Sequence, residues 1–137
     1  MVEHGSLKAC PLFLDWSPEQ LKMLEALCQE KILSPGEILF NQGEASESFY
    51  LIRRGTMGIK KFVGDGEEII ASFGTGSHFG ELAMLTRNSD IEKRSATAQA
   101  IEPSTVLAIP YLSFQKFLKS QPEASALFYR NLSLIHI

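Results

Sequence analysis

The sequence predicts a mainly β fold: an antiparallel β-roll, of the double-stranded β-helix or jelly-roll-like kind, with one N-terminal and two C-terminal helices. Between residues 37 and 109, short apolar runs alternate with turn residues at regular spacing, which is typical of an antiparallel barrel, roll or sandwich. On either side of this region, apolar residues recur at helical spacing. The 137 residues are 45% hydrophobic and 21% charged, the ordinary range for a chain that buries its own core. We therefore expect residues 1–137 to form a single domain, with a flexible N-terminus over residues 1–9.

The first element is a helix that is predicted to begin at Ser17. This serine can cap the helix, Pro18 suits its first position, and Gln20 can complete a capping box. Four apolar residues then recur at helical spacing: Leu21, Leu24, Leu27 and Cys28. The helix is expected to end before the turn at Ser34-Pro35-Gly36. On its apolar face, Cys28 is interpreted as a buried and inert thiol.

Short strands are predicted to follow. They lie at residues 37–40, 49–52, 56–63, 67–73, 95–100 and 106–109. Gly64-Asp65-Gly66 is interpreted as a hairpin tip, because glycine adopts a positive φ without a Cβ penalty. Phe40, Phe49 and Tyr50 are assigned to the core, and Arg53-Arg54 to a solvated turn.

Two helices are predicted after Pro110. The first has a short apolar face of Phe114, Phe117 and Leu118. Pro122 opens the second, whose apolar stripe consists of Ala124, Phe128, Leu132 and Ile135. The apolar end of the chain, residues 132–137, can pack on the roll, pair with a second chain in a homodimer, or belong to a longer protein.

Charge and cysteine content argue against several classes of partner. Thirteen basic and sixteen acidic residues give a net charge of -3, so nucleic acid is not an expected partner of this chain alone. The start of the sequence has no signal peptide, and no apolar run approaches the roughly 20 residues that span a bilayer. Two cysteines without CxxC spacing indicate neither a disulfide framework nor a metal site. We expect a cytoplasmic protein that does not act on a membrane.

Catalysis is not indicated either. His4, His78 and His136 fall in the terminus, a turn and the tail, which argues against a shared metal site. No Ser-His-Asp or Cys-His constellation is apparent. We therefore expect a protein that is not an enzyme and has no cofactor.

One segment carries the distinctive chemistry. It runs from Phe79-Gly80-Glu81 to Leu85, and Arg94-Ser95-Ala96-Thr97 follows. Glycine allows a close backbone approach, and a short helix beginning near Glu81 would turn free N–H groups outward. Arg94 offers a planar fork suited to phosphate oxygens, whereas an ionised Glu81 accepts from sugar hydroxyls and repels phosphate. Together these residues predict a pocket for a ligand with one anionic end and adjacent hydroxyls.

At these residues the sequence resembles the cyclic-nucleotide-binding domain family, of the catabolite activator protein and cAMP-dependent protein kinase regulatory subunit type. The family's phosphate-binding cassette is a Phe-Gly-Glu-Leu-Ala segment followed by Arg, a small residue and Ala. Here these elements stand at residues 79–83 and 94–97. The resemblance extends from about Cys10 onward. Further matching segments are Pro11-Leu12-Phe13, Ser34-Pro35-Gly36-Glu37, Asn41-Gln42-Gly43-Glu44 and Tyr50-Leu51-Ile52.

The resemblance implies a role for each matching residue. Arg94 would pair with the cyclic phosphate, assisted by Ser95 and the Ala96 amide. Glu81 and the Gly80 backbone would take the ribose 2′-hydroxyl. The amides of Leu82 and Ala83 would face the phosphate, and Ile70 would line the pocket. The implied ligand is cAMP, or secondarily cGMP, since Ser95 in place of threonine is more typical of cAMP-preferring members. The implied output is a movement of the C-terminal helices that an unknown effector detects.

Two departures leave alternatives open. Residues 86–93 form a longer segment than is common in the family, and Lys93 replaces the usual proline before Arg94. One alternative is therefore a degenerate, nucleotide-free interaction or dimerisation module in which Arg94 and Glu81 pair with each other. The other is the sensory half of a transcription regulator.

Overall fold

The strands form two four-stranded antiparallel sheets within residues 7–64, 66–81 and 94–135, which are the residues that the computed structural model describes. The first sheet has the order β1 (Gln29–Leu33), β8 (Ser104–Pro110), β3 (Ser48–Arg54) and β6 (His78–Phe79). The second has the order β2 (Ile38–Phe40), β7 (Thr97–Ala100), β4 (Met57–Val63) and β5 (Gly66–Phe73). The antiparallel β-roll predicted from the sequence is thus confirmed.

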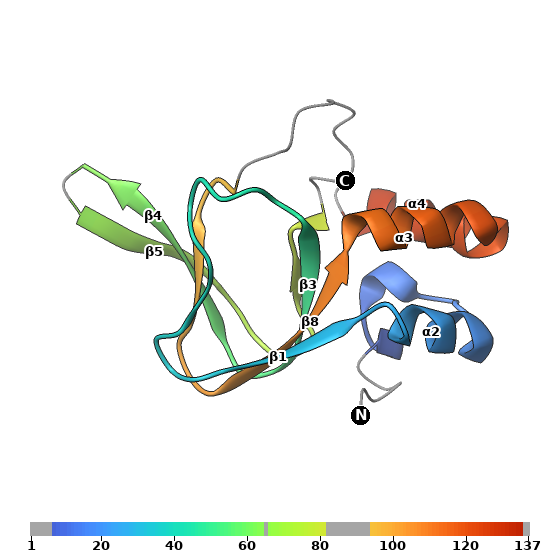
Figure 1. Cartoon of the computed structure of the whole chain (residues 1–137), viewed down its shortest axis with the longest axis horizontal. Helices are drawn as coiled ribbons and strands as arrows, with labels where there is room; N and C mark the ends of the chain where they lie inside the picture. Colours follow the sequence, from blue (N-terminus) through green and yellow to red (C-terminus); the bar gives the residue numbers. More distant parts are fainter. Residues whose placement is uncertain (1–6, 65, 82–93, 136–137) are drawn as a thin grey trace.

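The hairpin of β4 and β5 is also where the sequence places it. Val63 pairs with Gly66 across the tip, and Asp65 lies outside the described residues. The hairpin projects from the end of the roll that lies away from the helices (Figure 1). The expected strand at residues 95–100 begins only at Thr97.

β3 and β8 are buried on both faces, which explains their unbroken apolar sequences. Phe49 and Leu51 of β3 join the core beneath the helices, whereas Tyr50 and Ile52 join the core between the two sheets. Phe49 and Tyr50 are thus core residues, as predicted. β3 is the central wall that the helical layer and the roll interior share.

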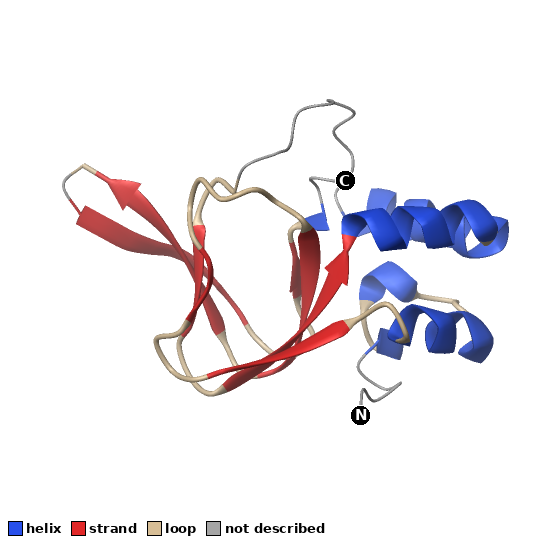
Figure 2. Cartoon of the chain, viewed as in Figure 1, coloured by secondary structure: helices blue, strands red, loops and turns tan. Residues whose placement is uncertain are grey.

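The helices gather on one side of the roll (Figure 2). They are the 3-10 turn η1 (Pro11–Phe13), α2 (Pro18–Glu25), α3 (Tyr111–Ser120) and α4 (Pro122–Ile135). Their aromatic side chains pack against one another. The rings of Phe114 and Phe128, for example, pack edge to face with their centroids 4.9 Å apart. The capping box predicted for α2 is present, because the Gln20 amide donates to the Ser17 hydroxyl and the Ser17 amide donates to the Gln20 side chain.

The first helix ends before Ser34, as predicted, but Leu27 and Cys28 of its predicted apolar face lie outside it, and Cys28 is only partly buried. α2 ends at Glu25, and residues 29–33 form β1, an edge strand with four exposed residues in succession. The residues of β1 would suit a helix, but their backbone pairs with β8. Tertiary pairing therefore overrides local propensity. Arg53 likewise lies in β3 and not in a solvated turn, and it forms an ion pair with Glu30 of β1.

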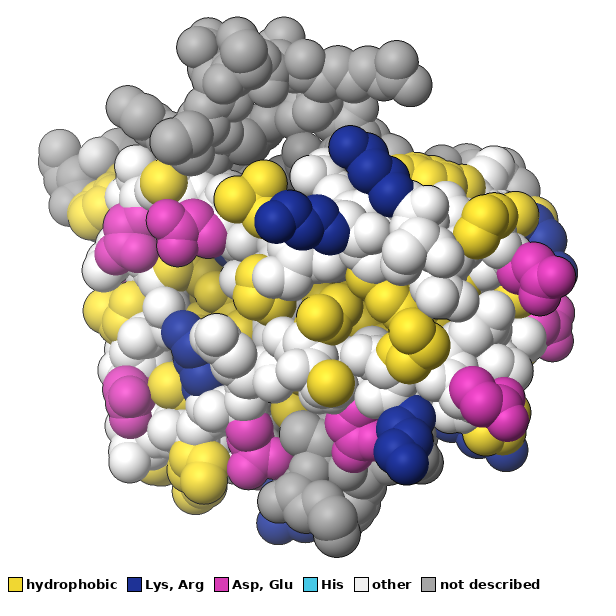
Figure 3. Space-filling model, turned by 45° about the vertical axis from the view of Figure 1, so that its right-hand side comes forward, with side chains coloured by type: hydrophobic (Ala, Val, Ile, Leu, Met, Phe, Trp, Pro, Cys, Tyr) yellow, Lys and Arg dark blue, Asp and Glu magenta, His cyan; other side chains and the backbone are white. Residues whose placement is uncertain are grey.

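The predicted stripe of α4 is only partly correct. Ala124, Phe128 and Leu132 are buried, but Ile135 is 37% exposed, because it lies in the last turn of the helix. The face of the molecule in Figure 3 carries apolar side chains between interspersed acidic and basic ones.

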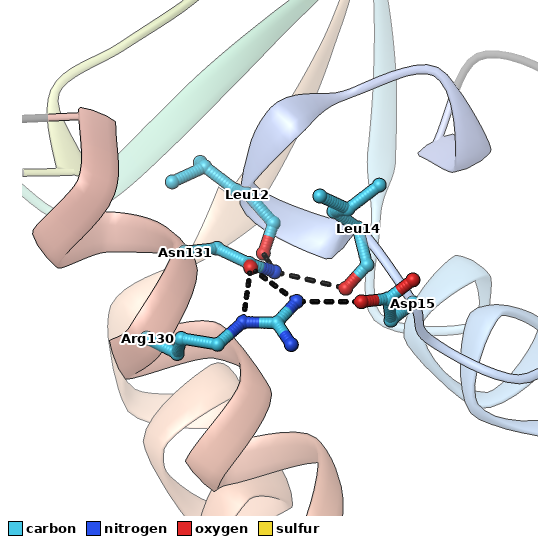
Figure 4. Close-up of polar contacts among 5 residues, drawn as sticks. All are labelled: Leu12, Leu14, Asp15, Arg130 and Asn131. Carbon is cyan, nitrogen blue, oxygen red and sulfur yellow. Dashed lines mark hydrogen bonds and ion pairs between the residues drawn. The ribbon is translucent and has the colours of Figure 1, made fainter.

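α4 is held to the N-terminal segment by a polar contact that interrupts its apolar face (Figure 4). Asn131 is 2% exposed, and its amide nitrogen donates to the carbonyl oxygens of Leu12 and Leu14, each at 3.0 Å. Arg130 donates to the Asn131 side-chain oxygen and to Asp15. Asn131 therefore satisfies backbone carbonyls that the helix would otherwise cover.

Candidate ligand-binding site

Backbone hydrogen bonds hold Arg94 in place without its side chain. Its amide donates to the Glu44 carbonyl oxygen at 2.7 Å, and its own carbonyl accepts from the Gly43 amide at 2.8 Å. The Gln42 amide donates to the Thr97 hydroxyl at 2.8 Å. The turn after β2 thus holds the chain at Arg94 and at Thr97, the first residue of β7. The position of the Arg94 backbone therefore does not depend on its guanidinium.

The Arg94 side chain turns into the protein and is 9% exposed. Its guanidinium carbon lies 4.2 Å from the centroid of the Phe40 ring and 5.5 Å from that of Tyr50. Nη2 donates to the Ser48 carbonyl oxygen, whereas Nε has no hydrogen-bond partner among the described residues. A buried cation with an unused donor is costly to leave without an acceptor, which is a reason to expect an anionic ligand here.

The pKa of Tyr50 also reflects the closeness of its ring to the Arg94 guanidinium. Burial raises the pKa of the Tyr50 hydroxyl, and the nearby Arg94 guanidinium opposes that shift. Aromatic rings beneath a guanidinium stabilise its charge through cation–π attraction. Phe40 and Tyr50 therefore form a platform for Arg94 as well as part of the core, a role that sequence reasoning missed.

Gly80 brings the second half of the site against the first. It has φ +92°, and a Cβ built on it would lie 3.0 Å from Arg94 Nη1 and 3.4 Å from Phe49 Cα. Such a φ strains residues with a side chain. Gly80 thus allows the segment after β6 to turn immediately beside the guanidinium.

Glu81 is 3% exposed and has a neighbour that sequence reasoning dismissed. His78 Nδ1 lies 2.8 Å from Glu81 Oε1. The three-residue spacing of His78 and Glu81 is the sequence signal that could have predicted this contact, and Gly80 between them has a positive φ.

Tyr111, the first residue of α3, connects the site to the helices. Its hydroxyl donates to the Gly80 carbonyl oxygen at 2.5 Å and lies 2.9 Å from the Ser46 hydroxyl. Its amide donates to the Glu47 carbonyl oxygen at 2.9 Å. The start of α3 is thereby tied to the residue that precedes Glu81.

Gly80 lies beside the Arg94 guanidinium, and Glu81 follows Gly80 in the chain and contacts His78. Ser95 is exposed and Ala96 is buried beside them at the start of β7. Leu82, Ala83 and the long segment 86–93 lie outside the described residues, as does nearly all of the short helix expected near Glu81. Ile70 lies on β5 with 54% of its side chain exposed.

The two thiols are unsuited to chemistry. Burial raises the pKa of both Cys10 and Cys28 to about 12, so neither forms appreciable thiolate near neutral pH. In the described part of the chain, no group of three or more His, Cys, Asp or Glu residues is placed to hold a metal ion. The same residues contain no helix long and apolar enough to cross a membrane.

A comparison with known families gives one match to this chain. The family described as "Cyclic nucleotide-binding domain" matches residues 30–121, from β1 to the end of α3. Among curated proteins, the Cyclic AMP receptor protein of Thermus thermophilus is 31% identical over 104 residues, which are 75% of this chain and 46% of that protein. The chain spans between a fifth and just under half of the length of the first such relatives.

Solved structures show the same fold. The N-terminal domain of a transcriptional regulator from Streptomyces coelicolor A3(2) superposes with a TM-score of 0.82 at 28% identity, covering 93% of this chain and 87% of that one. The sensor domain of the transcriptional regulator DNR from Pseudomonas aeruginosa gives a TM-score of 0.79 at 26% identity, covering 96% and 86%.

Proposed function

Because this chain belongs to the cyclic nucleotide-binding domain family, we propose that it is a sensor that binds cAMP in preference to cGMP and signals through its C-terminal helices. We assign the cyclic phosphate to Arg94, with Ser95 and the Ala96 amide beside it. The ribose 2′-hydroxyl is assigned to Glu81 and the Gly80 backbone. The Leu82 and Ala83 amides face the phosphate in this assignment, and Ile70 lines the base side of the pocket.

The observation that carries the proposal is the buried Arg94 guanidinium with its unused Nε donor. Among the described residues its side chain donates to a single backbone carbonyl, from Nη2. A phosphate would accept two charge-assisted hydrogen bonds in the geometry of the guanidinium fork. Glu81 lies next to Gly80, near enough to reach an adjacent sugar but of the wrong charge for the phosphate itself.

Calorimetric titration with cAMP, cGMP and 5′-AMP tests the proposal. We expect binding of cAMP, weaker binding of cGMP, and the weakest binding of 5′-AMP, whose open phosphate is bulkier and carries more charge. A parallel thermal melt should show stabilisation by cAMP, because a ligand that binds only the folded state raises its stability. If neither cyclic nucleotide produces heat or a thermal shift, the proposed function is wrong.

Gly80→Ala is expected to lower the affinity for cAMP by about tenfold. Forcing a side chain into the left-handed region costs about 1–2 kcal/mol, and the new Cβ would press on Arg94 Nη1. Relief of this strain would move the Gly80 backbone and the Arg94 guanidinium out of the binding geometry, and restoring that geometry at a cost of about 1.4 kcal/mol lowers the affinity by a factor of ten. Gly74→Ala is the matched control, because Gly74 has no positive φ and nothing lies within 4 Å of a Cβ there. Equal affinities of the two variants would contradict the argument.

We propose that Tyr111 transmits binding to the helices. Tyr111→Phe removes only the hydroxyl that bonds to the Gly80 carbonyl. The variant should bind cAMP within a few-fold of the parent, but the protection that cAMP gives to α3 and α4 amides in hydrogen exchange should decrease. Tyr129→Phe, at a half-exposed position on α4, is the control. Unchanged cAMP-dependent protection in Tyr111→Phe would refute the transmission role.

A second candidate is that the chain, one domain over residues 1–137, is the sensory part of a longer cytoplasmic regulator. It is favoured by the similarity to domains of two transcriptional regulators. Reading the gene beyond codon 137 tests it. Light scattering with and without cAMP tests the related proposal of a homodimer through α4; a dimer indifferent to nucleotide would favour the degenerate-module alternative.

A further inference from the structure

His78 is held rigidly at the edge of the site. It lies on β6, where it pairs with Leu51 of β3. The preceding turn is fixed by hydrogen bonds from the Gly76 amide to the Ile52 carbonyl and from the Ile52 amide to the Ser77 carbonyl, both at 2.8 Å. The backbone that carries the imidazole is therefore part of the sheet and not of a loose loop.

Glu81 is the residue that this fixed imidazole contacts. Its backbone is constrained on one side, because the Gly80 carbonyl accepts from Tyr111. A glutamate still has three side-chain torsions, and ordering them costs conformational entropy. His78 Nδ1 lies 2.8 Å from Oε1, and the two side chains are 11% and 5% exposed. The contact is close but lacks hydrogen-bond geometry, because Nδ1 has no hydrogen-bond partner among the described residues. The contact therefore takes up one carboxylate oxygen in a place where water competes little.

We propose that His78 is a positioning residue that orients the Glu81 carboxylate for the ribose 2′-hydroxyl. The inference rests on the proposed function and adds a residue to it. A carboxylate has about four acceptor sites on two oxygens, so contact with His78 at Oε1 leaves capacity for a sugar hydroxyl. Because the imidazole orders the carboxylate before the ligand arrives, that cost does not reduce the binding affinity. His78 thus sets how strongly the site distinguishes a ribose from a deoxyribose.

A cycle of two nucleotides and three variants tests the inference. The affinities of cAMP and 2′-deoxy-cAMP are measured by calorimetry for the parent chain and for two variants. His78→Phe keeps a ring but has no donor, and His78→Asn places an amide donor near the position of Nδ1. His78→Leu is a second variant without a donor, for use if the phenylalanine does not fit. Thermal melts accompany each measurement.

We expect the parent to prefer cAMP over 2′-deoxy-cAMP, and His78→Phe to reduce this preference by about two- to fivefold, the effect of a close polar contact and not of a full hydrogen bond. Its affinity for 2′-deoxy-cAMP should remain within about twofold of the parent, and His78→Asn should restore most of the preference. A purely structural role would weaken both nucleotides equally.

An unchanged preference in both donorless variants would overturn the inference while leaving the proposed function standing. A parent that binds neither nucleotide would overturn the proposed function and the inference together. A parent that binds both equally would remove the assignment of Glu81 to the ribose, and with it the role of His78.

Discussion

Arg94→Ala is expected to weaken cAMP binding by about 100-fold or more. The guanidinium would supply two hydrogen bonds to an anionic phosphate in a buried place, and hydrogen bonds to charged groups contribute about 1.5–3 kcal/mol each. Losing both amounts to at least about 3 kcal/mol, and each 1.4 kcal/mol is a factor of ten. Calorimetry with cAMP measures the loss directly.

The fold should survive this substitution. The backbone bonds of Arg94 to Gly43 and Glu44 do not involve the side chain, and the guanidinium Nε has no hydrogen-bond partner within the described part of the chain. The contacts with Phe40 and Tyr50 will be lost, so a modest decrease in the unfolding temperature is expected. Far-ultraviolet circular dichroism and a thermal melt without nucleotide check that the loss of affinity is local.

Two further variants show what Arg94 contributes beyond its charge. Arg94→Lys keeps the charge but loses the planar fork, so we expect an intermediate affinity, about tenfold or more below the parent. Arg54→Ala removes the same charge from an exposed position at the end of β3 and should leave cAMP binding unchanged. Affinity that persists in Arg94→Ala within a few-fold of the parent would show that the phosphate is not bound there.

The features that the sequence predicted correctly are those that local chemistry determines. The Ser17 capping box involves residues three apart, and the β4–β5 hairpin depends on glycines between its strands. The proximity of Gly80 to Arg94 rests on a family pattern. Each of these needs only nearby residues or a known spacing.

The features that the sequence did not predict depend on partners distant in the chain. β1 is a strand because β8 lies beside it, although its own exposed residues would suit a helix. β6 is two residues long and is defined by pairing with β3. The pairings of β1 and β6 leave no composition or periodicity signal in the sequence. The contact of His78 with Glu81 differs, because it joins residues only three apart on either side of the positive φ of Gly80.

Asn131 is the sharpest case, since a polar residue beside the apolar stripe of α4 suggests a solvated position. It is instead buried against η1, where its single amide group joins two backbone carbonyls. The aromatic rings of α3 and α4 explain why these helices pack on the roll. They do not determine the position of α4 along η1, whereas the two directional hydrogen bonds of Asn131 do.

Asn131→Leu is accordingly expected to lower the free energy of unfolding by about 2–3 kcal/mol. Leucine has a similar volume, so packing is nearly conserved, but the buried Leu12 carbonyl loses its donor, and such a loss costs about 1–3 kcal/mol. The Leu14 carbonyl and the Arg130 guanidinium lose partners at the more exposed rim, which adds less. Chemical denaturation measures the change.

Arg130→Met and Ser133→Ala separate the causes of this effect. Arg130→Met removes an exposed ion pair with Asp15 and the two hydrogen bonds to the Asn131 oxygen, so it should cost about 1–2 kcal/mol, less than Asn131→Leu. Ser133 is an exposed residue of the same helix whose change should be neutral. If Asn131→Leu is as stable as the parent, apolar packing alone fixes α4. If it is destabilised as expected, the position of α4 depends on the hydrogen bonds of Asn131 to two backbone carbonyls. Any nucleotide-driven movement of α4 away from η1 must then break those bonds.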